Sequence, residues 1–271
     1  MKKDFFKDSA IKFPAYEPWI SNDDKRTVNK ALNQSMLTLG PQLEKFERAF
    51  CKYTKSKYAI AVSNGTAALH LSLKALGIKE HDEVIIPDLT FVADASAILA
   101  SNAKPVIVDI NKNNFFLSIS SLKKNITKRT KAIIPVHIYG QVCNIAEVLD
   151  VARNNNLKII EDCAHAIGTF YNSKHVGTLG DTGCFSFYPT KNITTAEGGM
   201  VTTNSKKIAE KIRQLRSHGM SRSLKSRYSS GYPWIFDITE PGYNYRLDEI
   251  RAALGISQLK RIKKINGLRR N

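Results

Sequence analysis

The stretch CFSFYPTKNITTAEGG, residues 184–199, decides how this chain is interpreted. It places Lys191 between an apolar, strand-like segment (184–188) and a pair of glycines, Gly198 and Gly199. A lysine in such a loop is expected to be partly buried, and burial lowers the pKa of an ammonium group because the charged form loses its hydration. A neutral amine can attack a carbonyl, so Lys191 is a candidate for a lysine that forms a Schiff base. Four polar residues surround it in the sequence: Thr190, Thr194, Thr195 and Glu197.

Composition limits the class of protein. A chain of 271 residues suits one large domain, or one domain and part of a second. The hydrophobic content of 42% can build a sizeable core. No apolar run reaches the roughly 18 residues of a membrane span, and the charged start, MKKDFFKDSAIKF, lacks the apolar centre of a signal peptide. We therefore expect a cytoplasmic protein with no membrane partner.

The cysteines and the net charge exclude further classes. The four cysteines lie far apart without a CxxC pair, which predicts buried thiols, no disulfide framework and no metal site. The formal net charge of +17 can attract nucleic acid or small phosphorylated substrates. No helix-turn-helix, zinc-finger or RNP pattern accompanies that charge. We interpret most of it as solvated helix faces and expect no nucleic-acid partner.

Apolar strands alternate with helices along most of the chain. We predict an extended arm over 1–20, a polar and aromatic loop over 220–245, and a single long helix over 248–268. The predicted strands are 58–62, 83–87, 105–109, 132–136, 158–162, 184–188 and 199–203. The other predicted helices are 22–35, 42–53, 64–76, 91–99, 121–126, 145–155 and 205–218. This alternation predicts an α/β fold with a mostly parallel seven-stranded sheet covered by helices, and the last two strands are close enough to include an antiparallel pair.

Two motifs follow predicted strands. Ser63 and Asn64 precede Gly65 and Thr66 at a predicted helix start, where free N–H groups and the helix dipole suit a phosphate. An ordinary helix N-cap is the alternative. In IIEDCAHAIG (159–168), Asp162 ends a strand and His165 follows three residues later. A carboxylate there can hold a proton on a ring nitrogen, because ligands of open α/β sheets lie at the carboxyl ends of strands. A helix cap with a core histidine is the alternative.

Two aromatic stretches complete the set. Phe91 follows a strand that ends at Pro87 and could stack on a flat ring, although a core phenylalanine is the common alternative. The stretch PGYNYRLDE (241–249) places Asn244 among polar and aromatic groups before the last helix, with loop packing and an N-cap by Asp248 as the alternative. A phosphate cradle, a stacking ring, an acid for a ring nitrogen and an amine for an aldehyde together match pyridoxal 5′-phosphate (PLP).

At this point the sequence resembles the DegT/DnrJ/EryC1/StrS family of sugar aminotransferases, which have the aspartate-aminotransferase fold (PLP fold type I). The resembling segments run from about residue 12 to the end of the sequence. They include LTLGPQLEKFERAF, SNGTAALHL, DEVIIPDLTFVADA, IIEDCAHAIG, FSFYPTKNITTAEGGM and GYNYRLDEIRAALGISQL. The family often has glycine at the position of Ala196. Its members continue well beyond the length of this chain, so we expect a large PLP-binding domain over 21–245 and, over 246–271, only the start of a helix leading to a largely absent C-terminal domain.

The resemblance implies a role for each site residue. Lys191 would bind the cofactor aldehyde, Asp162 the pyridinium nitrogen, and His165 would lie near the phenolic oxygen. Phe91 would stack on the ring. Gly65, Thr66 and Ser186 would bind the phosphate, joined by Asn244 from the neighbouring subunit of a homodimer.

The implied activity is PLP-dependent transfer of an amino group from an amino acid, expected to be glutamate, to a keto group of a nucleotide-linked deoxysugar, for a surface polysaccharide or glycan. Arg246 or the 222–227 loop could meet the diphosphate. A truncated or non-catalytic PLP-binding member of the family is the alternative. A dehydratase is a further rival, but those relatives carry histidine at the position of Lys191.

Overall fold

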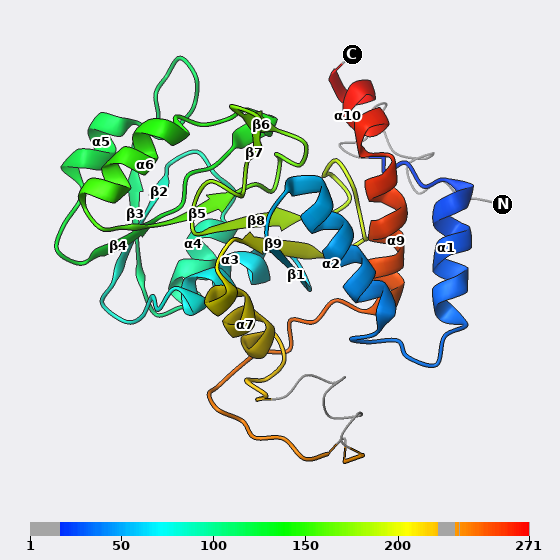
Figure 1. Cartoon of the computed structure of the whole chain (residues 1–271). Helices are drawn as coiled ribbons and strands as arrows, with labels where there is room; N and C mark the ends of the chain where they lie inside the picture. Colours follow the sequence, from blue (N-terminus) through cyan, green and yellow to red (C-terminus); the bar gives the residue numbers. More distant parts are fainter. Residues whose placement is uncertain (1–16, 222–230, 233, 271) are drawn as a thin grey trace, which may run out of the picture.

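The computed structural model describes residues 17–221, 231, 232 and 234–270, and in these residues helices cover both faces of a central sheet (Figure 1). The sheet strands are β1 (Tyr58–Val62), β2 (Glu83–Pro87), β3 (Lys104–Val108), β4 (Thr130–Ile133), β5 (Lys158–Asp162), β8 (Thr182–Ser186) and β9 (Gly199–Thr203). The helices are α1 (Asn22–Leu32), α2 (Pro41–Thr54), α3 (Gly65–Ala75), α4 (Ala93–Ala100), α5 (Ile119–Lys124), α6 (Ile145–Asn154), α7 (Lys206–Leu215), α9 (Glu249–Lys260) and α10 (Ile262–Arg270).

The sheet is mostly parallel, as predicted. Its strand order is β1-β9-β8-β5-β4-β2-β3, and β9 runs antiparallel to both of its neighbours. The other neighbouring strands pair in parallel. In parallel strands the carboxyl ends meet at one edge of the sheet. The ends of β1, β2, β5 and β8, with the loops that follow them, therefore come together there.

Successive side chains of the strands point to opposite faces of the sheet, and each face has its own hydrophobic core. Ile60, Val84 and Ile160 pack toward α3, α4 and α7 on one face. On the other face, neighbouring strand residues join two clusters. Ala61 and Phe185 pack with α2 and α9, and the remaining half of that face packs with α5 and α6. Because both faces are buried, the strands carry near-continuous apolar runs.

The N-terminal helices are capped by side chains. Ser21 and Asp24 form a capping box at the start of α1. Helix α2 begins after Gly40, which has no side chain to accept hydrogen bonds. The buried carboxylate of Glu249 takes that role instead and accepts from the backbone N–H groups of Gly40, Gln42 and Leu43.

The C-terminal helix departs from the prediction. The range 248–268 was predicted as one helix, but α9 ends before Arg261 and α10 starts at Ile262. The N–H of Arg261 bonds to the carbonyl of Gln258, three residues back, which tightens the last turn of α9. The guanidinium of Arg261 also binds the buried Asp24 carboxylate and lies over the Trp19 ring. These contacts with the N-terminal segment stabilise the interruption between α9 and α10.

Other corrections are small. β8 lies at 182–186 instead of 184–188, β4 ends at Ile133 instead of continuing to 136, and α5 begins at Ile119. The prediction missed the hairpin of β6 (Phe170–Tyr171) and β7 (Lys174–His175) and the short 3-10 segment η1 (Ile138–Gly140). Residues 1–16 of the predicted arm and 222–230 of the predicted loop lie outside the described residues.

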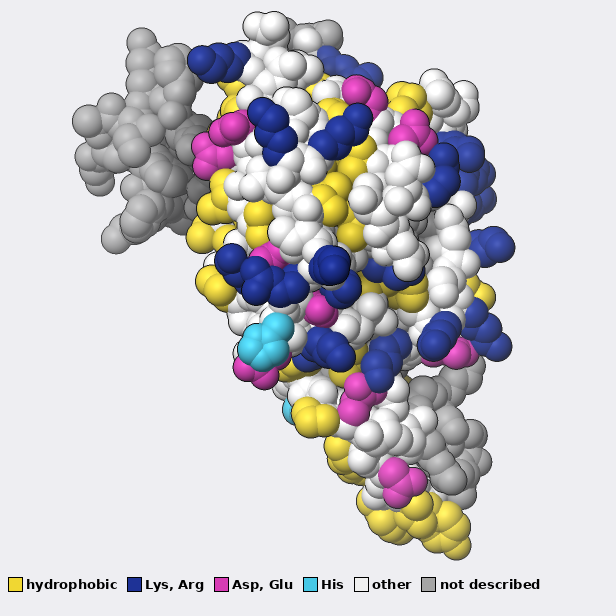
Figure 2. All heavy atoms as spheres, turned by 90° about the vertical axis from the view of Figure 1, so that its left-hand side faces the viewer, with side chains coloured by type: hydrophobic (Ala, Val, Ile, Leu, Met, Phe, Trp, Pro, Cys, Tyr) yellow, Lys and Arg dark blue, Asp and Glu magenta, His cyan; other side chains and the backbone are white. Residues whose placement is uncertain are grey.

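The surface of the described residues mixes basic and acidic side chains. In the described part of the chain, no helix combines the length and the apolar character needed to cross a bilayer. Figure 2 shows Lys and Arg side chains spread over one face with acidic side chains among them. Such mixing is typical of a solvated surface.

Candidate active site

A cavity of about 530 Å³, the cofactor pocket, opens at the carboxyl ends of β1, β5 and β8. This volume falls within the range of small-ligand sites. Seven of the eight predicted site residues line it: Gly65, Thr66, Phe91, Asp162, His165, Ser186 and Lys191. The eighth, Asn244, is exposed on the segment before α9 and is not among the lining residues.

Lys191 and Asp162 form the electrostatic centre of the pocket. Asp162 ends β5 and is 8% exposed, and its Oδ1 accepts a 2.8 Å hydrogen bond from the N–H of Ala164. Burial raises the pKa of Asp162, while the Ala164 hydrogen bond and the Lys191 charge act against that rise. Burial lowers the pKa of Lys191, and the Asp162 charge opposes this. The amine is therefore easier to deprotonate than in water, as a nucleophilic lysine requires.

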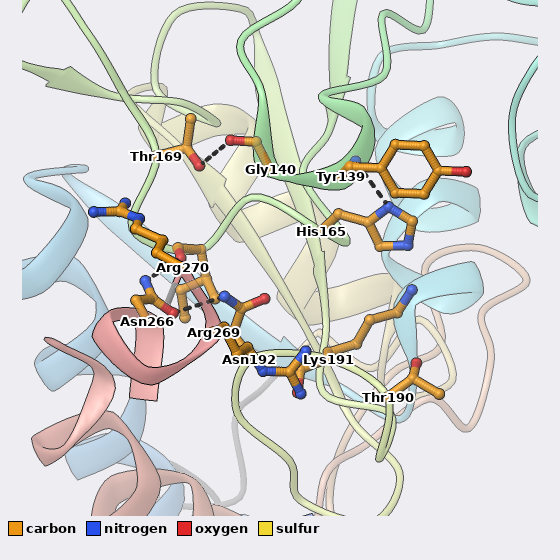
Figure 3. A pocket seen from close by; sticks show the side chains of 11 residues that line it. Tyr139, Gly140, His165, Thr169, Thr190, Lys191, Asn192, Asn266, Arg269 and Arg270 are labelled. Carbon is orange, nitrogen blue, oxygen red and sulfur yellow. Dashed lines mark hydrogen bonds between the residues drawn. The ribbon is translucent and has the colours of Figure 1, made fainter. Parts of the chain in front are cut away.

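His165 is a neutral hydrogen-bond donor in this pocket. Burial, and to a smaller extent the positive charge of Lys191, lowers its pKa to about 4. Its Nδ1 accepts a 3.3 Å hydrogen bond from the N–H of Tyr139, whose ring is stacked on the imidazole (Figure 3). This hydrogen bond assigns the ring proton to Nε2. The Nε2–H is thus available to an acceptor bound in the cavity.

The start of α3 forms one wall of the pocket. The N-cap Asn64 accepts from the N–H of Ala67 through Oδ1 at 2.7 Å. The N–H groups of Gly65 and Thr66 have no intrahelical acceptor, because they belong to the first turn. A Cβ at Gly65 would lie 2.9 Å from the Cβ of Ser186, so glycine lets the helix start lie directly against that residue. The hydroxyls of Thr66 and Ser186 with these N–H groups make a donor set that fits a phosphate.

Phe91 is a rim residue and not a core residue. It is 71% exposed at the cofactor pocket, which rules out the alternative of a core phenylalanine. An exposed ring beside an acid and an amine can stack on an aromatic ligand. Together with the phosphate cradle, Asp162 and Lys191, it gives PLP a matching group for each of its parts.

A second cavity of about 530 Å³, the side pocket, adjoins the first (Figure 3). The two share His165, Thr190 and Lys191. Helix α10 adds Arg269 and Arg270 to its wall, and among the described residues that line it none is acidic. An anionic molecule in the side pocket could therefore reach Lys191.

The Lys191 loop is held by its own threonines. The hydroxyl of Thr194 donates to the Phe187 carbonyl at 3.0 Å, and that of Thr195 donates to the Glu197 carbonyl at 2.8 Å. Between them and the glycine pair, Ala196 has a φ of 66°, in the left-handed region that favours glycine. This backbone conformation explains why glycine would suit the position.

A buried brace lies directly behind Asp162. The Glu161 carboxylate accepts from His137 Nε2 at 3.0 Å and from three backbone N–H groups at 2.8 Å each, those of Gly177, Leu179 and Gly180. His137, Glu161 and Cys163 are close enough to hold a metal ion. However, Nδ1 of His137 already accepts from the N–H of Cys143, and both Glu161 oxygens are occupied. We interpret the cluster as a structural support for the end of β5.

Sequence reasoning missed Asp94. It lies on α4, is 1% exposed, and accepts a 2.6 Å hydrogen bond from the Thr90 hydroxyl through Oδ2. Within the described part of the chain, Oδ1 has no hydrogen-bond partner. Burial raises its pKa well above 3.8, and the negative charge of Asp162 raises it further. Its signal in the sequence was weak, because one acid in the first turn of a helix usually serves the helix dipole.

Comparison with known proteins identifies the fold and the family. The DegT/DnrJ/EryC1/StrS aminotransferase family matches residues 18–271. The chain belongs to this family. Its members are PLP-dependent, and among the solved structures that match is one titled as the PLP form of a Streptococcus pneumoniae sugar aminotransferase, Spr1654. That structure is 32% identical and has a TM-score of 0.85, with 93% of this chain and 67% of that chain covered.

Two curated relatives of this DegT/DnrJ/EryC1/StrS chain have names that refer to sugar biosynthesis. It is 43% identical to the spore coat polysaccharide biosynthesis protein SpsC of Bacillus subtilis and 42% identical to GDP-perosamine synthase of Escherichia coli O157:H7. The matches cover 90% and 91% of this chain, but 63% and 65% of the two relatives. The chain thus spans less than two thirds of the length of these relatives.

Proposed function

We propose that this protein is a PLP-dependent aminotransferase that transfers an amino group from an amino acid, with glutamate as the expected donor, to a keto group of a nucleotide-linked deoxysugar. The observation that carries the proposal is that one cavity contains a desolvated lysine, a buried acid and a helix start with free N–H groups. The family match and the names of the relatives support the reaction class and the sugar substrate.

In this proposal the residues of the cofactor pocket hold PLP by its separate groups. Gly65, Thr66 and Ser186 bind the phosphate at the start of α3. The Asp162 carboxylate would hold a proton on the ring nitrogen. The Nε2–H of His165 donates to the phenolic oxygen, and Phe91 covers the ring. When bound, the cofactor supplies the electron sink for the Cα–H bond that is broken.

Lys191 then has two tasks. Its amine would hold the aldehyde carbon of PLP in the resting protein, and as a free amine it could accept and return the proton of the substrate Cα. Its depressed pKa suits both tasks, because a neutral amine can accept the proton and the resulting ammonium can return it. Asp162, which lines the same pocket, would stabilise a positive ring nitrogen.

The side pocket supports an anionic substrate. Its charged side chains are the cations Lys191, Arg269 and Arg270, which can attract the carboxylates of a dicarboxylic donor or the diphosphate of a nucleotide sugar. Arg246 stays a prediction as a diphosphate ligand, and residues 222–227 lie outside the described residues.

We also propose a cytoplasmic homodimer with shared active sites. Tyr139 is 73% exposed at the mouth of the side pocket, and aromatic residues are enriched at protein–protein interfaces. Asn244 is exposed and outside the pocket of its own chain, which suits a residue that reaches the phosphate of a second copy. Sedimentation should give a dimer, and Asn244→Ala should weaken PLP binding without changing sedimentation.

The test of the proposed function is chemical. Protein loaded with PLP should absorb in the band of a lysine-bound cofactor, and borohydride followed by peptide mapping should find the cofactor on Lys191. Lys191→Ala should abolish both the labelling and amino transfer to keto-sugar nucleotides. An identical reaction in Lys191→Ala would show that the mechanism is wrong. Cofactor binding without turnover over a panel of keto-sugar nucleotides and amino donors would instead indicate a non-catalytic member of the family.

A further inference from the structure

Asn266 of α10 connects two loops that are distant in the sequence. Its side chain is almost fully buried, with 9% of the residue exposed. Its Oδ1 accepts a 2.6 Å hydrogen bond from Nδ2 of Asn192, and its Nδ2 donates to the carbonyl of Ile167 at 3.0 Å. Both ends of the amide are thus engaged, each by a different loop. Figure 3 shows the first of these bonds, at the side of the pocket opposite Tyr139.

The two loops carry the chemistry of the cofactor pocket. Asn192 directly follows Lys191, and Ile167 ends the short segment that begins at Asp162 and includes His165. Two further contacts tighten the junction. Nη2 of Arg269 donates to the carbonyl of Lys191 at 3.0 Å. At Gly168, an added Cβ would lie 2.3 Å from Nδ2 of Asn266, so only glycine allows this approach.

The Lys191 loop and the segment that carries Asp162 are not joined covalently at the pocket, so their relative position depends on non-covalent contacts. Lys191 and Asp162 act on opposite parts of the same small ligand in the proposed reaction, so their separation must be held closely. A misplacement of about 1 Å can cost on the order of 100-fold in rate. Side chains that support reacting groups provide such precision when their own partners are fixed, as both ends of Asn266 are.

We propose that Asn266 is a positioning residue whose side-chain amide locks the Lys191 loop to the segment that carries Asp162 and His165. This inference rests on the proposed function for the roles of Lys191 and Asp162. The lock itself is a property of the protein without cofactor. Helix α10 therefore contributes to the active site through Asn266, although it lies far from β5 and β8 in the sequence.

Hydrogen exchange of the cofactor-free protein tests the lock directly. Asn266→Ala removes both bonds and should speed amide exchange in residues 164–168 and 190–194 together, by about ten-fold for one lost buried hydrogen bond. Asn266→Asp can still accept from Asn192 but cannot donate to the Ile167 carbonyl. It should leave exchange in 190–194 near wild type and speed exchange in 164–168. Lys263→Ala, on the exposed face of the same helix, is the matched control and should change neither segment.

Two results would overturn the lock. One is unchanged exchange in both segments of Asn266→Ala. The other is an increase spread evenly over α9 and α10, because that pattern would report loosening of the helix pair and not of the loops.

A second measurement separates positioning from folding. In protein loaded with PLP, the pH midpoint of the cofactor absorbance change should shift in Asn266→Ala and stay at the wild-type value in Lys263→Ala. A midpoint equal to wild type in Asn266→Ala, whatever its melting temperature, would overturn the positioning role. If the wild-type protein does not attach PLP to Lys191 at all, the proposed function fails, whereas the exchange result on the lock stands by itself.

Discussion

Lys191 and Asp162 line the same cavity, and each carries a charge that acts on the pKa of the other. Burial raises the pKa of the acid and lowers that of the amine, while their mutual attraction opposes both changes. They come from the ends of neighbouring strands, since β5 ends at Asp162 and β8 leads into the Lys191 loop. In the proposed function, this pairing across strands would let one small ring contact both groups.

Replacing the acid should weaken catalysis more than binding. Asp162→Asn keeps the shape of the side chain but loses the negative charge that, in the proposed function, holds a proton on the ring nitrogen. We expect kcat/KM for amino transfer to fall by about 100- to 1,000-fold, as for other lost electrostatic contacts to a transition state. Asp150→Asn, an exposed acid on α6, is the control and should react like wild type. Full activity in Asp162→Asn would contradict its assignment to the ring nitrogen.

Replacing Phe91 should weaken PLP binding but leave the stability of the fold unchanged. Because Phe91 is 71% exposed, Phe91→Ala should leave the free energy of unfolding of the cofactor-free protein within about 0.5 kcal/mol of wild type. Loss of stacking should weaken PLP binding by about 0.5–1.5 kcal/mol. Denaturant titration and equilibrium dialysis measure the two quantities. A large loss of stability with unchanged PLP affinity would mean that the ring has a packing role.

His165 should remain neutral throughout the range in which free histidine titrates. Its pKa is lowered to about 4, so NMR of the cofactor-free protein should show no transition of this ring near 6.5. In the unfolded chain the ring takes up its proton near 6.5, and in the folded protein it does so only near 4. Stability should therefore fall as the pH drops from 6.5 toward 4. His165→Gln should show a weaker pH dependence in this window, and an equal dependence would contradict the buried neutral ring.

Asp94 should make the folded protein less stable at neutral pH. Its folded pKa lies well above 3.8, so the folded state keeps a proton that the unfolded state has lost. The stability it contributes is present below 3.8 and declines as the pH rises through the folded pKa. Asp94→Asn, which cannot ionise, should be more stable than wild type at neutral pH. The difference should shrink as the pH approaches 3.8, and a variant that is less stable at neutral pH would contradict this account.

The Glu161 brace should be a major source of stability. In wild type, three backbone N–H groups donate to the Glu161 carboxylate. In Glu161→Gln, the side-chain NH₂ group would face these donors in place of an oxygen, so at least one buried N–H group would lose its acceptor. We expect the free energy of unfolding to fall by about 3 kcal/mol, as for other broken buried charge contacts. Addition of a zinc chelator to wild type should leave its stability unchanged if the cluster with His137 and Cys163 is structural. A large chelator effect would show that a metal contributes.

The sequence by itself determined the sheet, its alternation with helices and the positions of Asp162 and Lys191 near strand ends. These features are local, because periodicity of apolar residues and the residues that follow a strand can be read without knowing what packs against them. Phe91 shows the limit of such reasoning, since core and rim phenylalanines have the same local pattern, and only the packing of α4 showed that its ring is exposed.

Only the tertiary structure decided which distant residues support the site. Asp94 lies beside Asp162, and the C-terminal helix is interrupted at Arg261, which contacts Asp24 and Trp19. Asn266 joins two loops that lie 74 and 99 positions earlier in the chain. Each of these contacts depends on how α4, α9 and α10 dock on the sheet. Docking follows from the combined burial of many side chains, and no single segment of the sequence contains that information.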